Sequence, residues 1–236
     1  MSNSKKDIIF YTALVTGYIA FAVLMGNLYI NIAQKVSGPL NPNLKTIVID
    51  AGHGGEDSGA VADNGILEKD INLDIAKKLR DMLRATGYKV VMTRDDDNAI
   101  YDKNCKTLRK KKVSDMKKRV EIVNSDKNNI LVSIHQNKFE QKQYCGSQIF
   151  YSKNNESSLT LAQSVQKSIK NLIQPDKDRE LKCANKNIYL LNQANVPAII
   201  VECGFVSNDE ELEKLMDENY KLNMAFSIYS GIIATF

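Results

Sequence analysis

Short apolar runs rich in β-branched residues alternate with amphipathic segments along most of this chain, and this alternation limits the folds open to it. Strands are expected at LKTIVID (44–50), YKVVMT (88–93), NILVSIH (129–135), SQIFY (147–151), NIYLL (187–191) and PAIIVECGF (197–205). Strands that alternate with helices are typical of a mostly parallel sheet with helices on both faces. The sequence therefore predicts a three-layer α/β fold around a twisted, mostly parallel sheet.

The segments between these runs carry helical patterns. Apolar residues three or four positions apart, such as Ile71, Ile75 and Leu79, predict a helix over 68–85. Further helices are expected over 114–124, after a cap at Ser157, and after a capping box of Ser207 and Glu210. The charged stretch 95–112 is expected to be irregular.

The amino-terminal region differs from the rest in its charge. No charged residue occurs between Ile8 and Gln34, and Lys5 and Lys6 precede this run. A spanning helix needs about 20 apolar residues, and the basic side of such a helix stays in the cytoplasm. The expected organisation is a cytoplasmic tail (1–7), a membrane anchor or signal segment (8–34), a linker (35–43) and an extracytoplasmic globular domain (44–236). Whether the anchor is cleaved is left open.

Charge and cysteine content exclude several kinds of site. Beyond the amino-terminal region the charges nearly balance, so no nucleic-acid partner is expected. The one local excess is a basic run at 109–118, which is typical of a solvated face but could also meet an anionic wall polymer or a lipid surface. The four cysteines lack the paired spacing of a zinc knuckle or redox motif. They are Cys105, Cys145, Cys183 and Cys203, and their disulfide state is not set by the sequence.

The only two histidines are His53, which follows an expected strand, and His135, which ends one. The carboxyl ends of parallel strands meet at one edge of a sheet, where ligands usually bind. Imidazole is the commonest metal ligand among side chains, and a catalytic zinc takes three protein ligands and leaves one position open. Glu68, at the start of the first long helix, is the natural third ligand. Asp50, Glu56, Asp57 and Asp70 are its rivals, and two unrelated histidines are the alternative to a metal site.

Glu202 is a carboxylate inside the apolar run PAIIVECGF. Burying a charge is costly unless the group is paired or has a chemical role. Beside a metal site, such a carboxylate can accept a proton from water and pass it to a leaving amine. A salt bridge at the end of the sheet is the alternative explanation.

Four separated stretches resemble the zinc-dependent N-acetylmuramoyl-L-alanine amidase family, often called amidase type 3. They are IVIDAGHGGEDSGA, LEKDINLDIAKKL, SIHQN and NVPAIIVECGFVSNDEE, and the resemblance covers residues 45–234. It implies that His53, Glu68 and His135 bind one zinc ion, that Glu202 is the catalytic acid and base, and that Asn137 contacts the substrate. With its short chain and single anchor, the protein most resembles the spore-cortex amidases of the CwlD type.

The expected function follows from this resemblance. It is hydrolysis of the amide between N-acetylmuramic acid and L-alanine in peptidoglycan, at the membrane and in spore-cortex maturation. A zinc peptidase acting within the stem peptide and a non-catalytic peptidoglycan-binding module are the alternatives. A further hypothesis is a regulatory partner protein that loads or holds the zinc, with the long basic excursion 95–118 as its docking surface. The oligomeric state and the preferred form of peptidoglycan stay open.

Overall fold

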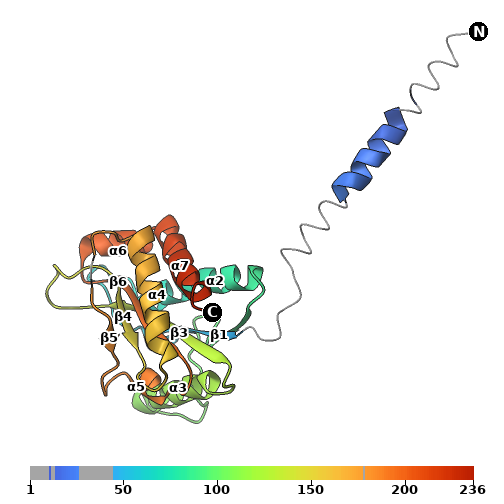
Figure 1. The fold of residues 1–236 in the computed structure, drawn as a ribbon. Helices are drawn as coiled ribbons and strands as arrows, with labels where there is room; N and C mark the ends of the chain where they lie inside the picture. The colour runs from blue at the N-terminus through green and yellow to red at the C-terminus, as the bar shows by residue number, and fades with distance from the viewer. Residues whose placement is uncertain (1–10, 12–13, 27–44, 178) are drawn as a thin grey trace, which may run out of the picture. The chain divides into compact units, whose positions relative to one another are not determined.

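The computed structural model describes residues 11, 14–26, 45–177 and 179–236 (Figure 1). The chain divides into two units, Met1–Pro42 and Asn43–Phe236. The described part of the first unit is helical. Among the described helices, none combines the length and the apolar character that crossing a membrane requires. The expected tail and linker, and both ends of the expected anchor 8–34, lie outside the described residues.

The second unit is built on one six-stranded sheet, in the order β2-β1-β3-β6-β4-β5. The strands are β1 (Thr46–Ala51), β2 (Lys89–Met92), β3 (Asn129–Asn137), β4 (Gln148–Tyr151), β5 (Lys182–Cys183) and β6 (Ala198–Phe205). β4 runs antiparallel to β6, while β2, β1, β3 and β6 run parallel to one another. The carboxyl ends of β1, β3 and β6 therefore lie at the same edge of the sheet.

Helices cover both faces of the sheet and enclose two apolar cores (Figure 1). They are α2 (Glu68–Ala85), α3 (Leu108–Val123), α4 (Ser157–Leu172), α5 (Tyr189–Gln193), α6 (Asp209–Met216) and α7 (Glu218–Ile233). Alternate residues of a strand point to opposite faces. Accordingly Ile47 and Ile49 join the core under α2, α4 and α7, whereas Val48 joins the core under α3 and α5. This confirms the predicted α/β class with helices on both faces.

The segment NIYLL was predicted to be a strand, and this prediction is wrong. Its last three residues begin the short helix α5, in which Leu190 and Leu191 are buried in the second core. Asn192 turns the chain by donating from Nδ2 to the carbonyl oxygens of Asn185 and Ile188. Asparagine side chains favour such local bonds over a strand ladder. The strand beside β4 is instead the pair Lys182–Cys183, which the sequence analysis missed.

The starts of three helices differ from the predictions. α3 begins at Leu108, inside the stretch expected to be irregular, because the Thr107 side chain accepts a hydrogen bond from the Lys110 amide. Ser157 does not cap α4. For α6 the cap is Asn208, which accepts from the Glu211 amide, so the capping box of Ser207 and Glu210 is not formed.

Candidate active site

The first histidine is placed by an unusual backbone turn at the end of β1. His53 has a φ of 62°, a conformation that few residues other than glycine adopt. The His53 carbonyl oxygen accepts a hydrogen bond of 2.7 Å from Nη2 of Arg119, and the Gly52 amide donates to the carbonyl of Ile134 on β3. Because the His135 ring fills the space where a Cβ of Gly52 would lie, only glycine fits there. Both histidines are thereby held at one edge of the sheet.

Three side chains that the sequence predicted as ligands meet at this edge. Nε2 of His53 lies 3.3 Å from Oε1 of Glu68, and Nδ1 of His135 lies 3.0 Å from the same oxygen. One ligand atom from each residue lies within 4.8 Å of the other two. Two imidazoles and one carboxylate form a known donor set of catalytic zinc sites. The residues present therefore fit a zinc ion.

The rivals of Glu68 are engaged elsewhere. Asp50 is buried and accepts hydrogen bonds from Arg119, Thr93 and Ser133. Glu56 pairs with Lys111 at the surface, and Asp70 is exposed on α2. Asp57 contacts His53, but on the ring nitrogen that faces away from Glu68.

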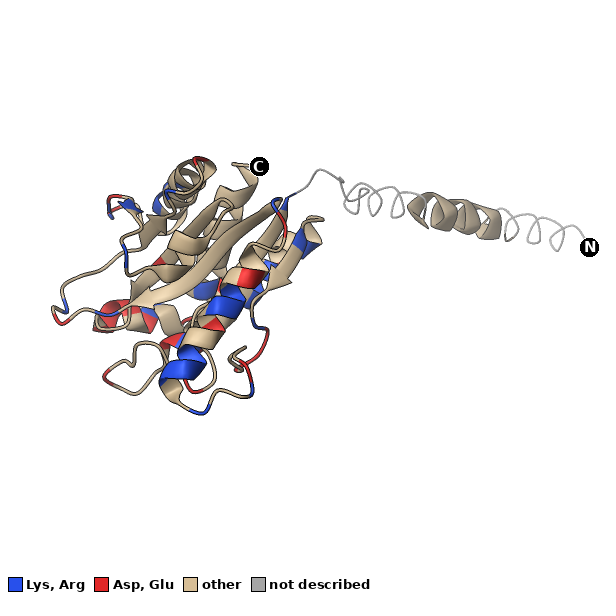
Figure 2. Cartoon of the chain, turned by 90° about the horizontal axis from the view of Figure 1, so that it is seen from below, with Lys and Arg blue, Asp and Glu red and all other residues tan. Residues whose placement is uncertain are grey.

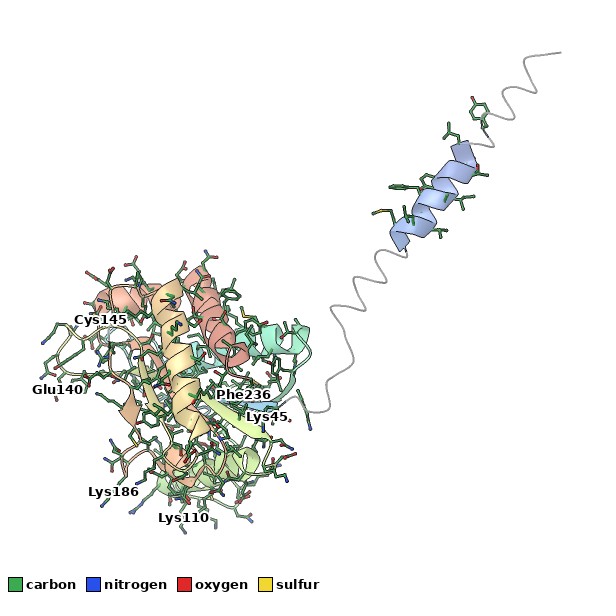
Figure 3. All side chains as sticks on the ribbon, in the orientation of Figure 1. Lys45, Lys110, Glu140, Cys145, Lys186 and Phe236 are labelled. Atoms are coloured by element: carbon green, nitrogen blue, oxygen red, sulfur yellow. The ribbon has the colours of Figure 1, made fainter. Side chains whose placement is uncertain are left out.

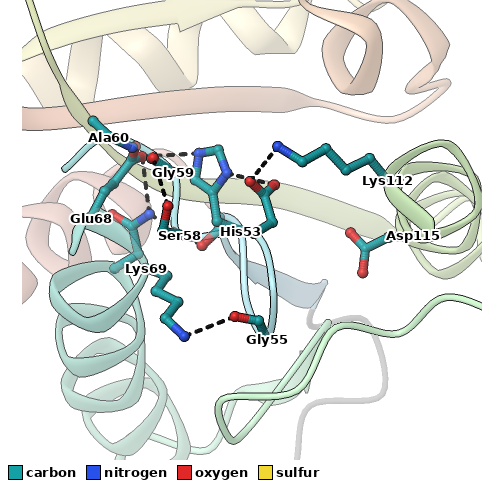
Figure 4. A network of polar contacts seen from close by, with 12 residues as sticks. His53, Gly55, Ser58, Gly59, Ala60, Glu68, Lys69, Lys112 and Asp115 are labelled. Carbon is teal, nitrogen blue, oxygen red and sulfur yellow. Dashed lines mark hydrogen bonds and ion pairs between the residues drawn. The ribbon is translucent and has the colours of Figure 1, made fainter. Parts of the chain in front are cut away.

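This contact of Asp57 orients the His53 ring, which Figure 4 shows between Glu68 and Lys112. Oδ2 of Asp57 lies 2.9 Å from Nδ1 of His53, and its other oxygen lies 2.7 Å from Nζ of Lys112 on α3. Burial alone would lower the pKa of His53, but hydrogen bonds to Asp57 and Glu68 raise it to about 9. A carboxylate on the outer nitrogen of a ligand histidine fixes the tautomer and leaves the inner nitrogen to the metal.

Glu68 is held by a second set of hydrogen bonds. Its Oε2 accepts from the Ala60 amide at 2.7 Å, and its Oε1 accepts from the Gln136 amide and from Nδ2 of Asn72, both at 3.1 Å. Although burial raises the pKa of this carboxyl, hydrogen bonds with His135 and His53 outweigh burial and hold it well below its usual range. Glu68 is therefore an anion whose position is fixed from several sides.

Glu202 lies beside this cluster on β6, where it pairs in register with His135. Among the described residues, its buried Oε2 has no hydrogen-bond partner. Burial raises the pKa of Glu202 to about 7, and the nearby anion Glu68 adds to this rise. A carboxyl with a pKa near neutrality can both accept and release a proton at working pH.

Comparison with known proteins identifies the family. The model of the family described as N-acetylmuramoyl-L-alanine amidase (Amidase_3) matches residues 47–234. The chain belongs to this amidase family. Its activity is therefore that of an N-acetylmuramoyl-L-alanine amidase, which is a hydrolase of the cell wall.

Relatives and solved structures agree with this family. The germination-specific N-acetylmuramoyl-L-alanine amidase of Bacillus subtilis (strain 168) is 33% identical over 81% of this chain and 80% of its own. The CwlD amidase of Clostridioides difficile, solved in complex with the GerS lipoprotein, is 42% identical, with a TM-score of 0.78 over 81% of this chain and 98% of that one. AmiC2 of Nostoc punctiforme is 32% identical, with a TM-score of 0.66 over 80% of this chain and 96% of that one. The amidase thus resembles a germination-specific amidase and other amidases of bacteria.

A buried ionic network below the cluster was not foreseen. Nη1 of Arg119 donates to Oδ1 of Asp50 at 2.6 Å and to the Ala51 carbonyl at 2.8 Å, and Arg94 donates to the carbonyls of Ala51 and Gly52. The Arg119 guanidinium holds the pKa of Asp50 at about 2, against the effect of burial. The signal available in the sequence was Arg119, a charged residue on the apolar side of a helical pattern. The network fixes the backbone from which the amidase presents His53.

The remaining sequence predictions concern Asn137 and the cysteines. Asn137 ends β3, and its carbonyl accepts from the Val206 amide at 2.9 Å, while the role of its side chain in substrate contact stays a prediction. All four cysteines are free in the structure. Cys203 is fully buried in the first core.

Proposed function

We propose that this amidase is a zinc-dependent hydrolase that cleaves the amide between N-acetylmuramic acid and L-alanine in peptidoglycan. One observation carries the proposal: three ligand atoms from His53, Glu68 and His135 lie within 4.8 Å of one another, beside Glu202, whose buried Oε2 has no hydrogen-bond partner in the described part of the chain. These three residues would hold one zinc ion in each catalytic domain, with a position left for substrate or water.

The side chains divide the chemistry between them. A zinc ion bound here supplies Lewis acidity, which polarises the scissile carbonyl and makes the attacking water more acidic. Glu202 accepts the proton of this water as the new C–O bond forms. It then donates the proton to the nitrogen of L-alanine as the C–N bond breaks. Asn137, at the end of β3, is proposed to contact the substrate.

The proposed setting is the spore cortex, outside the cytoplasm. Support comes from the germination-specific amidase of B. subtilis and from the CwlD amidase of C. difficile, both of which resemble this chain. The uncharged segment 8–34, preceded by Lys5 and Lys6, would hold the protein at the membrane, or would direct its secretion if it is cleaved.

A regulatory partner protein that affects zinc loading is part of the proposal. The CwlD amidase of C. difficile was solved in complex with a lipoprotein, GerS, which supports a partner for this chain. The basic helix α3 offers a route for its effect, because Lys111 and Lys112 pair with Glu56 and Asp57, just after His53. Figure 2 shows the distribution of basic and acidic residues over the sheet and its helices.

Mass spectrometry of the released fragments tests the reaction. The full-length protein with zinc should release stem peptides that begin with L-alanine. A peptidase would leave L-alanine on muramic acid, and a binding module would release no peptide. Glu202→Ala should keep the zinc and lose hydrolysis, His53→Ala should lose both, and Asp70→Ala, at an exposed acid, should lose neither. An active Glu202→Ala protein would contradict the assigned role.

A further inference from the structure

The loop 138–147 stands at the same edge of the sheet as the candidate active site. It leaves β3 directly after His135 and Asn137, and Asn137 pairs in register with Phe205 of β6. It returns into β4 at Gln148, which lies opposite Glu202 because β4 is antiparallel to β6. Figure 3 labels Glu140 and Cys145 in this loop, which projects from the body of the domain.

The loop carries an exposed aromatic pair. Phe139 is 51% exposed and Tyr144 is 41% exposed, with their ring centroids 5.2 Å apart in an edge-to-face arrangement. The Tyr144 ring stacks at 6.3 Å on Phe205, which is buried at the end of β6, and the Arg179 guanidinium lies 5.1 Å from the centre of the Phe205 ring. Two adjoining aromatic rings that are exposed to solvent beside an active site indicate a ligand-binding surface.

Several contacts hold the loop in place. The Phe139 amide donates to Oγ of Ser207 at 3.0 Å, and Nδ2 of Asn208 donates to the Lys142 carbonyl at 2.8 Å. On its other side, Nζ of Lys138 donates to the Val61 carbonyl at 2.7 Å. The loop therefore spans from the segment that precedes α2 to the start of α6. A surface fixed in this way loses little conformational entropy when it binds a ligand.

The charges around the pair indicate an uncharged ligand. Lys142 pairs with Asp63 at 2.7 Å, and the other two charged residues of the loop, Lys138 and Glu140, have opposite signs, so these four charges balance. Stem peptides carry free carboxylates, whereas the glycan strand of peptidoglycan is built of neutral N-acetylated sugar rings. The flat C–H face of a sugar ring packs well on the negative face of an aromatic ring.

We propose that Phe139 and Tyr144 form a platform for the glycan strand, which stacks the sugar next to the muramic acid that is being cleaved. Phe139 lies four residues beyond His135, and four extended residues span at most about 14 Å. The platform is thus close enough to hold a neighbouring sugar of the same strand while the scissile amide lies at His135. This inference rests on the proposed function and adds the part of the substrate that the site recognises.

Two substrates separate glycan recognition from chemistry. The first is intact peptidoglycan, and the second is an N-acetylmuramoyl peptide, which has the scissile amide but no neighbouring sugar. With the full-length zinc-loaded protein, Phe139→Ala combined with Tyr144→Ala should raise KM for peptidoglycan about 10-fold and leave kcat unchanged. Both constants for the N-acetylmuramoyl peptide should stay as in the wild type. Phe226→Ala removes a similarly exposed ring on α7, 45% exposed, and should change neither substrate.

Soluble chitin oligosaccharides provide an independent probe, because they share the N-acetylated sugar rings and lack peptide. They should inhibit cleavage of peptidoglycan by the wild type, and should inhibit the Phe139→Ala, Tyr144→Ala protein less. An unchanged KM for peptidoglycan in that protein, an equal loss on both substrates, or inhibition by free stem peptide instead of chitin oligosaccharides would each overturn the platform. A wild type that cleaves neither substrate would instead refute the proposed function.

Discussion

The substitution Gly52→Ala tests whether the site depends on one missing side chain. A Cβ at position 52 would lie 2.3 to 2.7 Å from three atoms of the His135 ring. The backbone there cannot retreat easily, since its carbonyl accepts from Arg94 and Asn72 and its amide donates to Ile134. The imidazole must therefore move by about 1 Å to reach an ordinary contact distance.

The magnitude follows from the cost of overpacking. An extra methyl group in a packed site costs about 1 to 3 kcal/mol. If the His135 ring gives way, this cost appears as zinc affinity lowered by roughly 5- to 150-fold. Competition with a chromophoric chelator measures the affinity, and denaturant unfolding of the zinc-free protein measures the stability. We expect the affinity to fall and the free energy of unfolding to change much less.

Gly231→Ala is the matched control, because a Cβ at position 231 would lie 2.4 Å from the backbone of Val165. This clash lies between α7 and α4, away from the ligands, so it should lower the free energy of unfolding and leave zinc affinity unchanged. If Gly52→Ala binds zinc like the wild type and only loses stability, the backbone has moved instead of His135, and the reasoning is refuted.

Two further predictions concern the carboxylates of Asp57 and Asp50. Asp57→Asn removes the anion on the outer nitrogen of His53 and should weaken zinc binding about 10- to 100-fold. Glu56→Gln breaks only a surface pair with Lys111 and should leave zinc binding unchanged. Zinc titrations that give the same affinity for both variants would refute this prediction. The pKa of Asp50 is about 2 in the folded protein, below its unfolded value, so its stabilisation is complete above about pH 4 and is lost as the pH falls to about 2. In acid unfolding the zinc-free wild type should therefore lose about 2 kcal/mol more than Asp50→Asn over that range, and parallel curves would contradict the assignment.

The sequence predicted the elements whose patterns are strong and local. The bounds of α2 and the positions of β1, β3 and β6 follow from their apolar periodicity; Glu68, His135 and Glu202 lie on these elements, and His53 follows two residues after β1. The choice of Glu68 over its rivals did not follow from spacing. It required the family resemblance or the fold, because each rival could be dismissed only by the partner that occupies it.

What the sequence could not supply were contacts between distant segments. Asp50 and Arg119 are 69 positions apart, and nothing local to either residue identifies the other. The same holds for Asn72, which joins Glu68 to the Gln136 side chain. NIYLL was predicted to be a strand, but Asn192 binds the carbonyls of Asn185 and Ile188, and the chain forms a helix there.

The reversed direction of β4 has a consequence for how such enzymes can diversify. Two parallel neighbours must be joined by a crossover that carries the chain back to the far end of the sheet, usually as a helix. Because β4 runs against β6, the chain that leaves β3 re-enters the sheet at the same end, and the segment 138–147 need not support a core. Its length is not set by the spacing of the packed layers, which it contacts through Tyr144 on Phe205 and through the Gly146 amide on Glu211. Because β4 runs in the opposite direction, the strands that position the candidate active site are separate from the segment 138–147. This segment can differ between enzymes that act on different cell walls.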